Sequence, residues 1–308
     1  MTASTHLIRQ MGHVAFAVPD PELSAQDLVD LVGLKVTGRD ADTVYLSSNT
    51  RVNEISYRRA PQAGVIAVGL EALDEAAVDE VTRRARAAGL EILDDRPLDP
   101  RCARAVRFVA PFGIVLEVHS PVPRSAAQRH IGSGSRPRRI EHVNFKAPDP
   151  LAMRDTFHSV LGMRMSDRTE GNEFLWFRAH DGHHHTVAVF GGEPGLHHYA
   201  FDFHSMEDLA KIADSLVLKR RKLLWGPGRH GAGGNIFQYY VDPNHCVVEM
   251  SVEMDRIDLD ETWEARAWTF SPSLADEWIN LWGSPPPANF TDPGLPFVDV
   301  PAAVTTGV

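Results

Sequence analysis

A repeat with an offset of 129 residues is the feature that most constrains how this chain can fold. Residues 13–21 read His-Val-Ala-Phe-Ala-Val-Pro-Asp-Pro, residues 142–150 read His-Val-Asn-Phe-Lys-Ala-Pro-Asp-Pro, and six of the nine positions are identical. A second pair of strings supports the repeat, because Phe-Val-Ala-Pro precedes Glu117 and Tyr-Val-Asp-Pro precedes Glu249 by the same spacing. Solenoid repeats are much shorter than this offset. The sequence therefore predicts a duplicated domain.

The same order of elements, a strand followed by a helix and three more strands, is expected twice in each half. Helices are expected at 74–88 and about 206–217, between segments rich in apolar and β-branched residues. The pattern predicts an α+β fold of two halves, each with two βαβββ modules. The other expected strands are Val44–Ser47, Glu54–Arg58, Val65–Leu70, Ala105–Val109, Val115–Val118, Phe174–Arg178, His185–Phe190, His198–Phe203, Phe237–Val241 and Val247–Val252.

The Pro-Asp-Pro strings predict where the first helix of each half begins. Asp20 and Asp149 can each accept hydrogen bonds from the free N–H groups of a first turn that opens with proline. Gly33 and Gly162 are suited to a left-handed residue after the last turn. Ser205 with an acidic residue three positions later predicts a capping box for the helix near 206.

Composition shifts divide the chain into four parts. We expect an N-terminal two-module domain at 1–122, a linker rich in Pro, Ser, Gly and Arg at 123–138, a second two-module domain at 139–254, and a C-terminal arm at 255–308. The arm holds four of the six tryptophans and a Pro/Gly-rich end. We expect it to pack over the domain surface or a neighbouring subunit, and a lid over an active site is the alternative.

Charge and cysteine content narrow the range of partners. The net charge of -10 argues against nucleic acid or an anionic membrane as a partner. No apolar run is long enough to cross a bilayer. The two cysteines, Cys102 and Cys246, lack the spacing of a zinc or redox motif. We therefore expect a cytoplasmic protein that binds neither nucleic acid nor membrane.

Two histidines and one carboxylate in the second half have the composition of a metal site. His142, His198 and Glu249 lie in three β-rich strings, so they can converge only if these strands are neighbours. Two imidazoles and one carboxylate form the ligand set of mononuclear non-haem iron oxygenases, which leaves metal positions open for substrates. The first half has His13 and Glu117 at the matching positions, but no histidine between 13 and 119. We therefore expect the metal site in residues 139–254 alone.

Further histidines lie close to these strings in sequence. His183, His184 and His185 precede an apolar run, and a strand would turn His184 away from the other two. We expect His183 to lie in a solvated loop, and the same loop is the alternative for His184. Residues 226–231, Gly-Pro-Gly-Arg-His-Gly, read as a glycine-rich turn that carries His230 and lacks the ending of a phosphate loop. Tyr239 follows on a strand.

The combination of strings resembles the type I extradiol ring-cleavage dioxygenases of the vicinal oxygen chelate superfamily. The resemblance rests on Gly-Pro-Gly-Arg-His at 226–230, Tyr-Tyr-Val-Asp-Pro at 239–243, Leu-His-His-Tyr-Ala-Phe at 196–201 and His-Thr-Val-Ala at 185–188. It covers roughly residues 8–255 and is greatest for the catechol and homoprotocatechuate 2,3-dioxygenases. The family fold implies an open mixed sheet around a cavity in each domain.

Three positions depart from the family pattern. Gln238 stands where an aliphatic residue or Phe is usual, and His245 where Gly or Pro is usual. Trp225 stands where family members that accept a ring carboxylate have arginine, which argues against a carboxylated substrate such as homoprotocatechuate.

The resemblance implies a role for each residue that matches the family motifs. His142, His198 and Glu249 would bind Fe(II), with Mn(II) as an alternative, and His185 would be the active-site acid/base. His230 would hydrogen-bond a substrate oxygen together with the hydroxyl of Tyr239. Asn144, Trp176, His197 and Trp225 are expected to line the substrate pocket.

The implied reaction is the insertion of both atoms of O2 into an aromatic diol, which gives a muconic semialdehyde-type product, in a homo-oligomeric enzyme. Two other functions fit the same architecture. A glyoxalase-like or epimerase-like metal enzyme would transfer protons without dioxygen, and would have no need of His185, His230 and Tyr239. A metal-free binding protein of the antibiotic-resistance type would have no need of the two histidines and the glutamate.

Overall fold

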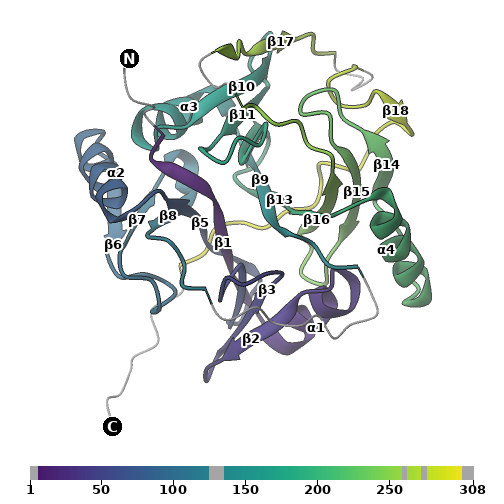
Figure 1. Ribbon diagram of the computed structural model, residues 1–308, viewed down its shortest axis with the longest axis horizontal. Coiled ribbons are helices and arrows are strands. Elements are labelled where there is room, and N and C mark those ends of the chain that lie inside the picture. Colours follow the sequence, from purple (N-terminus) through teal and green to yellow (C-terminus); the bar gives the residue numbers. More distant parts are fainter. Residues whose placement is uncertain (1–5, 125–134, 259–261, 272–275, 300–308) are drawn as a thin grey trace.

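The computed structural model describes residues 6–124, 135–258, 262–271 and 276–299 as two sheets that lie side by side (Figure 1). The first sheet has eight strands in the order β2-β3-β4-β1-β5-β8-β7-β6. Its strands are β1 (Ile8–Val18), β2 (Lys35–Arg39), β3 (Thr43–Ser47), β4 (Ile55–Arg59), β5 (Gly64–Ala72), β6 (Glu91–Asp94), β7 (Ala105–Val109) and β8 (Val115–His119). Helices α1 (Pro21–Leu31) and α2 (Glu75–Ala87) and a 3-10 turn, η1 (Pro111–Gly113), connect them.

The second sheet repeats this order and adds one strand at each edge, in the order β17-β10-β11-β12-β9-β13-β16-β15-β14-β18. Its strands are β9 (Arg139–Ala147), β10 (Arg164–Thr169), β11 (Phe174–Arg178), β12 (Val187–Gly191), β13 (Gly195–Asp202), β14 (Trp225–Arg229), β15 (Ile236–Val241), β16 (Val247–Val252), β17 (Arg266–Trp268) and β18 (Trp282–Gly283). Helices α3 (Pro150–Asp155) and α4 (Met206–Leu218) and a π-turn, η2 (Thr156–Val160), complete it.

Two βαβββ modules in each half confirm the predicted fold class. In the second half the modules meet where β9 pairs antiparallel with β13, and β13 pairs parallel with β16. In the first half β1 pairs antiparallel with β5, and β5 parallel with β8, in the same way. The sheets are therefore mixed, and the two central strands of each sheet come from different modules. The division at 122, 138 and 254 stays a prediction, and most of the predicted linker, 125–134, lies outside the described residues.

The predicted helix starts at Pro-Asp-Pro are confirmed. Asp20 accepts hydrogen bonds from the N–H groups of Glu22 and Leu23, and Asp149 caps the first turn of α3 in the same way. Gly33 and Gly162 have φ values of +82° and +65°, which L side chains rarely adopt.

The predicted capping box at Ser205 does not form. The Ser205 hydroxyl makes no capping hydrogen bond, and the Asp208 carboxylate accepts from the N–H of His204 instead. The shorter Asp side chain reaches a different N–H from the one that Glu would reach in this position.

Several strands differ from the expected ones for identifiable reasons. The Gly-Pro-Gly segment forms β14, although glycine and proline are rare in strands, because it lies near the sheet edge and pairs with both β15 and β18. The polar strand β10 was not expected, since its residues lack clear alternation. The expected strand at His185–Phe190 begins only at Val187, because the N–H of His184 leaves the sheet to bond the carbonyl of Asp255.

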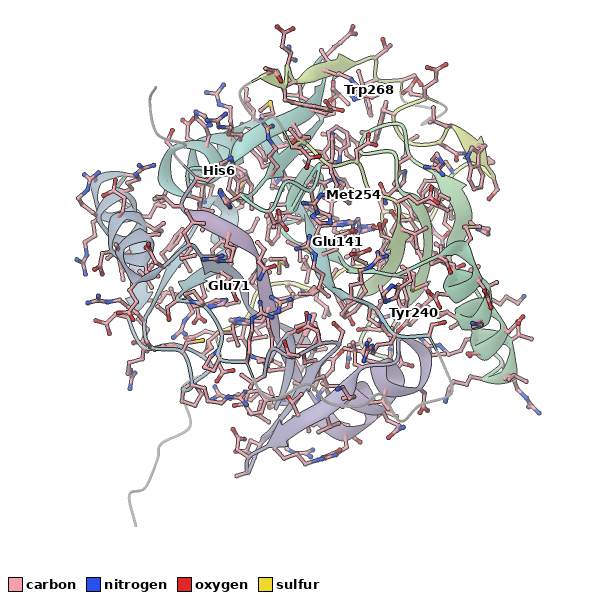
Figure 2. The ribbon with its side chains drawn as sticks, viewed as in Figure 1. His6, Glu71, Glu141, Tyr240, Met254 and Trp268 are labelled. Carbon is pink, nitrogen blue, oxygen red and sulfur yellow. The ribbon has the colours of Figure 1, made fainter. Side chains whose placement is uncertain are left out.

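The C-terminal arm runs along the second sheet and returns to the first (Figure 1). It supplies β17 and β18, and Figure 2 shows Trp268 of β17 at the edge of the molecule. Further along, Leu295 bridges to Leu196 of β13, and Phe297 bridges to Val65 of β5. The arm therefore packs over both halves. The last residues of the arm, 300–308, lie outside the described residues.

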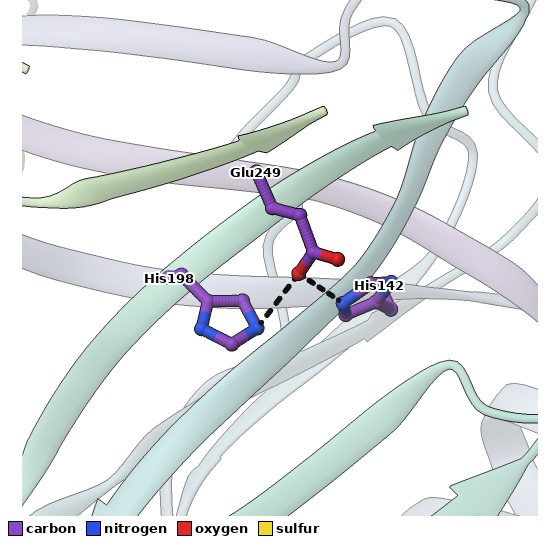
Figure 3. Close-up of side chains that lie close together, drawn as sticks. All are labelled: His142, His198 and Glu249. Carbon is purple, nitrogen blue, oxygen red and sulfur yellow. Dashed lines mark hydrogen bonds and ion pairs between the residues drawn. The ribbon is translucent and has the colours of Figure 1, made fainter. Parts of the chain in front are cut away.

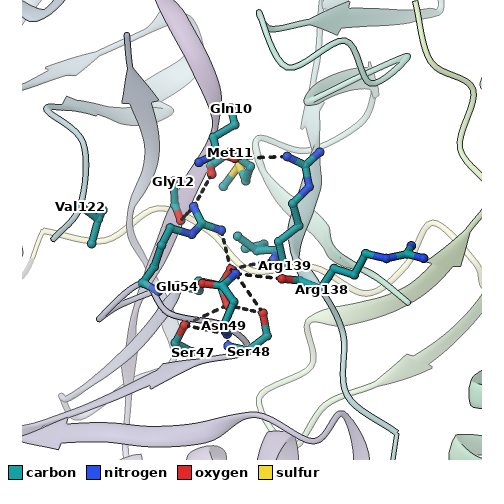
Figure 4. A network of polar contacts seen from close by, with 12 residues as sticks. Gln10, Met11, Gly12, Ser47, Ser48, Asn49, Glu54, Val122, Arg138 and Arg139 are labelled. Carbon is teal, nitrogen blue, oxygen red and sulfur yellow. Dashed lines mark hydrogen bonds and ion pairs between the residues drawn. The ribbon is translucent and has the colours of Figure 1, made fainter. Parts of the chain in front are cut away.

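A buried carboxylate joins the two halves close to the start of β9 (Figure 4). Glu54 is fully buried, pairs with the Arg51 guanidinium, and accepts from both the N–H and the hydroxyl of Ser48 at 2.6 Å. It also accepts from the N–H of Ile140 at 3.0 Å. Ile140 lies two residues before His142, so this contact fixes the strand that carries the first predicted ligand.

Candidate metal centre and active site

The three predicted metal ligands meet on adjacent strands. His142 lies on β9, His198 on β13 and Glu249 on β16, and all three are buried. One oxygen of Glu249, Oε2, lies 3.1 Å from His142 Nε2 and 3.3 Å from His198 Nε2 (Figure 3). One ligand atom of each residue lies within 4.8 Å of the others. The parallel pairing of β13 with β16 brings sequence-distant residues to one point.

These distances fit a metal ion bound on one face. Two ligand atoms about 2.1 Å from a metal and at right angles to each other lie roughly 3 Å apart. The atoms behind the ligands are also placed for this role: Glu141 Oε2 lies 3.1 Å from His142 Nδ1, and Asn235 Nδ2 donates to Glu249 Oε1 at 3.0 Å. Such partners fix the orientation of metal ligands. The donor set therefore fits a divalent non-haem metal.

The electrostatics of the cluster favour a cation. Burial lowers the pKa of His142, but the carboxylates of Glu249 and Glu141 outweigh burial and raise this pKa to about 9. Burial lowers the pKa of His198 well below 6.5, and the neighbouring His197 and His142 lower it further. A fully buried carboxylate thus attracts one positive charge, which a proton on His142 or a metal ion can supply.

The three residues that the family resemblance assigned to catalysis surround the same cavity. The His185 ring lies 4.4 Å from the His142 ring, measured between centroids. His230 Nε2 lies 2.9 Å from the Tyr239 hydroxyl, and the Tyr239 ring lies 5.5 Å from that of His198. Burial raises the pKa of Tyr239 well above 10, and Glu249 adds to this effect. The phenol therefore keeps its proton.

The predicted pocket residues divide into two groups. Asn144, Trp176 and Trp225 line the cavity. His197 does not: it is fully buried behind His198, where its two ring nitrogens contact His198 Nδ1 and the Phe290 carbonyl. Successive residues on a strand point to opposite faces, so His197 and His198 cannot both face the cavity. We therefore replace the expected substrate contact of His197 with a supporting position.

Much of the cavity wall was not predicted. Trp278, Ile279, Phe290 and Thr291 of the arm line it, so the arm closes one side of the site. The cluster of tryptophans in the arm was the one feature of its sequence that indicated this contribution to the cavity wall. Phe174 also lines the cavity, and its place two residues before Trp176 on β11 could have indicated this.

The histidines before β12 are not solvated. His184 is fully buried and His183 is 9% exposed, which contradicts the expected loop in solvent. A second cluster of possible ligand atoms, Glu141, His183 and Asp202, lies near them. The guanidinium groups of Arg139 and Arg256 both contact His183 Nδ1, so positive charge is already present there.

The first half keeps the frame of the site without the third ligand. His13 Nε2 lies 3.6 Å from Glu117 Oε1. Ala15 and Asn144 are equivalent positions of the repeat. Asn144 pairs with His198 on the neighbouring strand, whereas Ala15 pairs with Ala67, so an alanine occupies the position of the second histidine. Among the described residues, no cluster of possible metal ligands lies in this half.

The sequence profile of the Glyoxalase/Bleomycin resistance protein/Dioxygenase superfamily matches residues 10–118 and 139–250. The chain belongs to this superfamily. The two matched segments cover most of β1 to β8 and of β9 to β16, and the gap between them contains the predicted linker. The predicted membership of the vicinal oxygen chelate superfamily is thereby confirmed.

Members of the superfamily that resemble this chain include dioxygenases and a glyoxalase. A manganese-dependent 2,3-dihydroxybiphenyl 1,2-dioxygenase of Geobacillus genomosp. 3 is 25% identical over 285 residues, which cover 85% of this chain and 90% of that protein. The Mn(II)-bound glyoxalase from Novosphingobium aromaticivorans is 28% identical, with a TM-score of 0.82 over 91% of this chain and 93% of that one. Homoprotocatechuate 2,3-dioxygenase from Arthrobacter globiformis shares the fold, with 22% identity, a TM-score of 0.84, and 97% and 96% coverage.

Proposed function

We propose that this protein is an extradiol dioxygenase, which inserts both atoms of O2 into a catecholic ring next to the diol. One observation carries the proposal: two histidines and a glutamate converge on one face of a cavity that His185, His230 and Tyr239 also line. A facial set of three ligands leaves room for a bidentate diol and for dioxygen. The resemblance to a 2,3-dihydroxybiphenyl 1,2-dioxygenase supports this reaction class.

His142, His198 and Glu249 would hold Fe(II) or Mn(II), since the ligand set suits both ions. The bound ion would supply Lewis acidity toward the diol and a path for electrons from the diol to dioxygen. Two of the similar proteins are named for manganese, and for this reason we propose Mn(II) as well as Fe(II).

The side chains around the metal ligands would orient the ring and handle its protons. The Tyr239 hydroxyl, 2.9 Å from His230 Nε2, would donate to that nitrogen and leave its own oxygen to accept a hydrogen bond from the diol. His185 lies against His142 and would accept a proton from the bound diol and later return it to an oxygen derived from O2 as the O–O bond breaks. Asn144 adds an amide to the same cavity.

The cavity wall favours an uncharged ring. Phe174, Trp176, Trp225 and Phe290 present aromatic surface, and the described residues that line the cavity include no arginine or lysine. Trp225 Nε1 donates to the carbonyl of Ser284, so this indole is held in place by the arm. We therefore propose catechol, alkylcatechols or 2,3-dihydroxybiphenyl as substrates in preference to a catechol with a carboxylate.

The test begins with the full-length protein loaded without air with Fe(II) or, separately, with Mn(II). Each diol is then added, air is admitted, and oxygen uptake is followed together with the yellow absorbance of a ring-fission product. The Zn(II)-loaded protein is the matched control, because zinc accepts the same ligands and has no redox chemistry. Oxygen uptake with Fe(II) or Mn(II) alone supports the proposal. Bound Fe(II) and Mn(II) without oxygen uptake for any diol would contradict it.

A non-oxidative metal enzyme is the second candidate, and the resemblance to a Mn(II)-bound glyoxalase is the observation that favours it. Such an enzyme would convert a substrate without consuming oxygen. Turnover of a hemithioacetal under argon, combined with no reaction of any diol in air, would select this alternative.

We also propose a cytoplasmic homo-oligomer. Both cysteines are buried and free, which suits a reducing compartment. Leu281 and Trp282 are exposed at the edge strand β18, where a second subunit could cover them. None of the described helices has the length and apolar character of a membrane span. Light scattering after size-exclusion chromatography tests the oligomeric state, and a monomer at micromolar concentration would exclude it.

A further inference from the structure

Three histidines of the cavity share an arrangement on the side that faces away from it. In His198, His185 and His230, the ring nitrogen Nδ1 is hydrogen-bonded to a group behind the ring. In each case the chain of contacts ends on the C-terminal arm. A neutral imidazole carries one proton, so the partner of Nδ1 decides whether Nδ1 or Nε2 holds it.

His197 is the partner of His198, and a backbone carbonyl fixes the tautomer of His197. His197 Nε2 lies 2.8 Å from the carbonyl oxygen of Phe290, which can only accept, so Nε2 of His197 carries the proton. His197 is fully buried against the rings of Phe190 and Phe290, where a charged imidazole would be costly, so the ring is neutral and its Nδ1 accepts. His198 Nδ1, at 2.8 Å, must therefore donate. Nε2 of His198 is left with its lone pair, which would bind a metal ion that it shares with the nearby Glu249 carboxylate.

His184 is the partner of His185, and the carboxylate of Asp167 lies beside His184. His184 Nε2 lies 3.2 Å from Asp167 Oδ2, close although not aligned as a hydrogen bond, and His184 Nδ1 lies 3.1 Å from His185 Nδ1. A carboxylate favours the proton on His184 Nε2, which makes Nδ1 of a neutral His184 an acceptor for His185.

Asp167 is itself anchored by the arm strand β17. The Trp268 indole donates to Asp167 Oδ2 at 2.7 Å, and the N–H of Arg266 donates to Oδ1 at 3.0 Å. Asp167 is buried and Trp268 is partly buried, although Arg266 is exposed, and a Cβ at Gly233 would come within 3.4 Å of both His184 and His185. The carboxylate therefore stays in place.

His230 contacts the arm directly. Its Nδ1 lies 2.5 Å from the carbonyl oxygen of Ile279, so Nδ1 donates and Nε2 accepts from the Tyr239 hydroxyl. The same logic thus gives all three rings a proton on Nδ1 and a lone pair on Nε2.

We propose that the C-terminal arm fixes the tautomers of His198, His185 and His230, so that each ring turns an unprotonated Nε2 toward the cavity. His184, His197 and Asp167 then act as positioning residues that connect the arm to these rings. The proposal rests on the proposed function for its consequence: a diol must lose protons, and Nε2 of His185 can accept one, while Nε2 of His198 is free to bind the metal and Nε2 of His230 holds the Tyr239 hydroxyl. The tautomers themselves can be measured without any turnover.

The decisive measurement is the tautomer of His185 and His230 in the full-length protein loaded with Zn(II), which is diamagnetic. Nitrogen-15 NMR of histidine-labelled protein distinguishes a protonated from an unprotonated ring nitrogen. We expect Nδ1 protonated and Nε2 unprotonated in both rings. A proton on Nε2 of His185, as a doubly protonated His184 would impose, overturns the proposal. This result is independent of whether any diol is cleaved.

Two variants of His184 test whether the position of its hydrogen-bonding atoms, and not only its packing, sets the tautomer of His185. In His184→Asn the amide stands near the former Nδ1 and can accept from His185, whereas in His184→Gln it stands near the former Nε2 and contacts Asp167 alone. We expect His184→Asn to keep the His185 tautomer and most of the turnover. His184→Gln should mix the tautomers and lower kcat by at least roughly tenfold, with bound metal unchanged. Equal spectra for both variants and the wild type would contradict the role of His184.

Discussion

The hydroxyl of Tyr57 on β4 lies 3.3 Å from the hydroxyl of Tyr199 on β13, across the boundary between the two halves. Both side chains are fully buried, and the Tyr199 hydroxyl also donates to Asp242 Oδ2 at 3.3 Å. Tyr199 directly follows the predicted metal ligand His198. The half without a metal site therefore supports the strand that carries a ligand in the other half.

Removing this contact should destabilise the protein modestly. Tyr57→Phe deletes one buried hydroxyl while Tyr199 keeps its bond to Asp242, so we expect a loss of about 0.5–1.5 kcal/mol in the free energy of unfolding. Urea denaturation measures it. Tyr45→Phe is the matched control, because its hydroxyl bonds Asp40 at the surface. An equal loss in both variants would show that the contact between the halves contributes no more than a hydrogen bond at the surface.

The neighbouring Asp242 makes stability depend on pH. Burial raises the pKa of this carboxyl from 3.8 to about 7. Its protonated form is favoured in the fold, so its contribution is complete below about pH 4 and is lost as the pH rises through about 7. Asp242→Asn keeps an acceptor for the N–H groups of Asn244 and Cys246 but cannot ionise.

We expect the wild type to lose roughly 1–4 kcal/mol relative to Asp242→Asn between about pH 4 and about pH 8. Urea unfolding of both proteins across this range provides the comparison. Parallel stability curves would mean that Asp242 does not titrate in this range.

His185 should matter for turnover and not for metal binding. His185→Ala removes the acid/base while His142, His198 and Glu249 remain, so we expect turnover of diols to fall by roughly 10²–10⁴ with metal content unchanged. Stopped-flow absorbance and elemental analysis give the two values. His204→Ala, at an exposed position, should leave both unchanged. Full turnover in His185→Ala would remove this residue from the mechanism.

The buried pair Arg51 and Glu54 should be the costliest polar contact to break. Burial would raise the pKa of Glu54, but Arg51 and the Ser48 donors outweigh burial and lower it. Arg51→Met leaves this carboxylate buried without its cation, and we expect a loss of about 3–5 kcal/mol in the free energy of unfolding.

Arg39→Met, in the exposed pair with Glu22, is the control, with an expected loss below about 1 kcal/mol. Urea unfolding at neutral pH measures both. A similar small loss in Arg51→Met would show that water reaches Glu54 once the guanidinium is removed.

The sequence indicated the fold and the predicted ligand set because both depend on local patterns. The repeat at His13 and His142 gave the duplication, and strand periodicity gave the central strands of each sheet. Residues such as His142 and Glu249 were recognised because a metal needs particular atoms, and few residue types supply them.

What the sequence did not indicate depends on contacts between distant segments. Strand β14 forms from a Gly-Pro-Gly segment only because β15 and β18 lie beside it. His197 was placed in the pocket, since one sequence does not show which of two adjacent histidines faces inward. The contribution of Phe290 and Ile279 to the site was invisible, because they act partly through backbone carbonyls that every residue has.

The two carbonyls of the arm that contact His197 and His230 have a consequence for how this site can change over generations. A carbonyl is present whatever the side chain, so substitutions at 279 and 290 can accumulate without altering it. A deletion or insertion between those positions would displace both at once. In descendants of this chain, the length of that segment should therefore be under stronger selection than its amino-acid sequence.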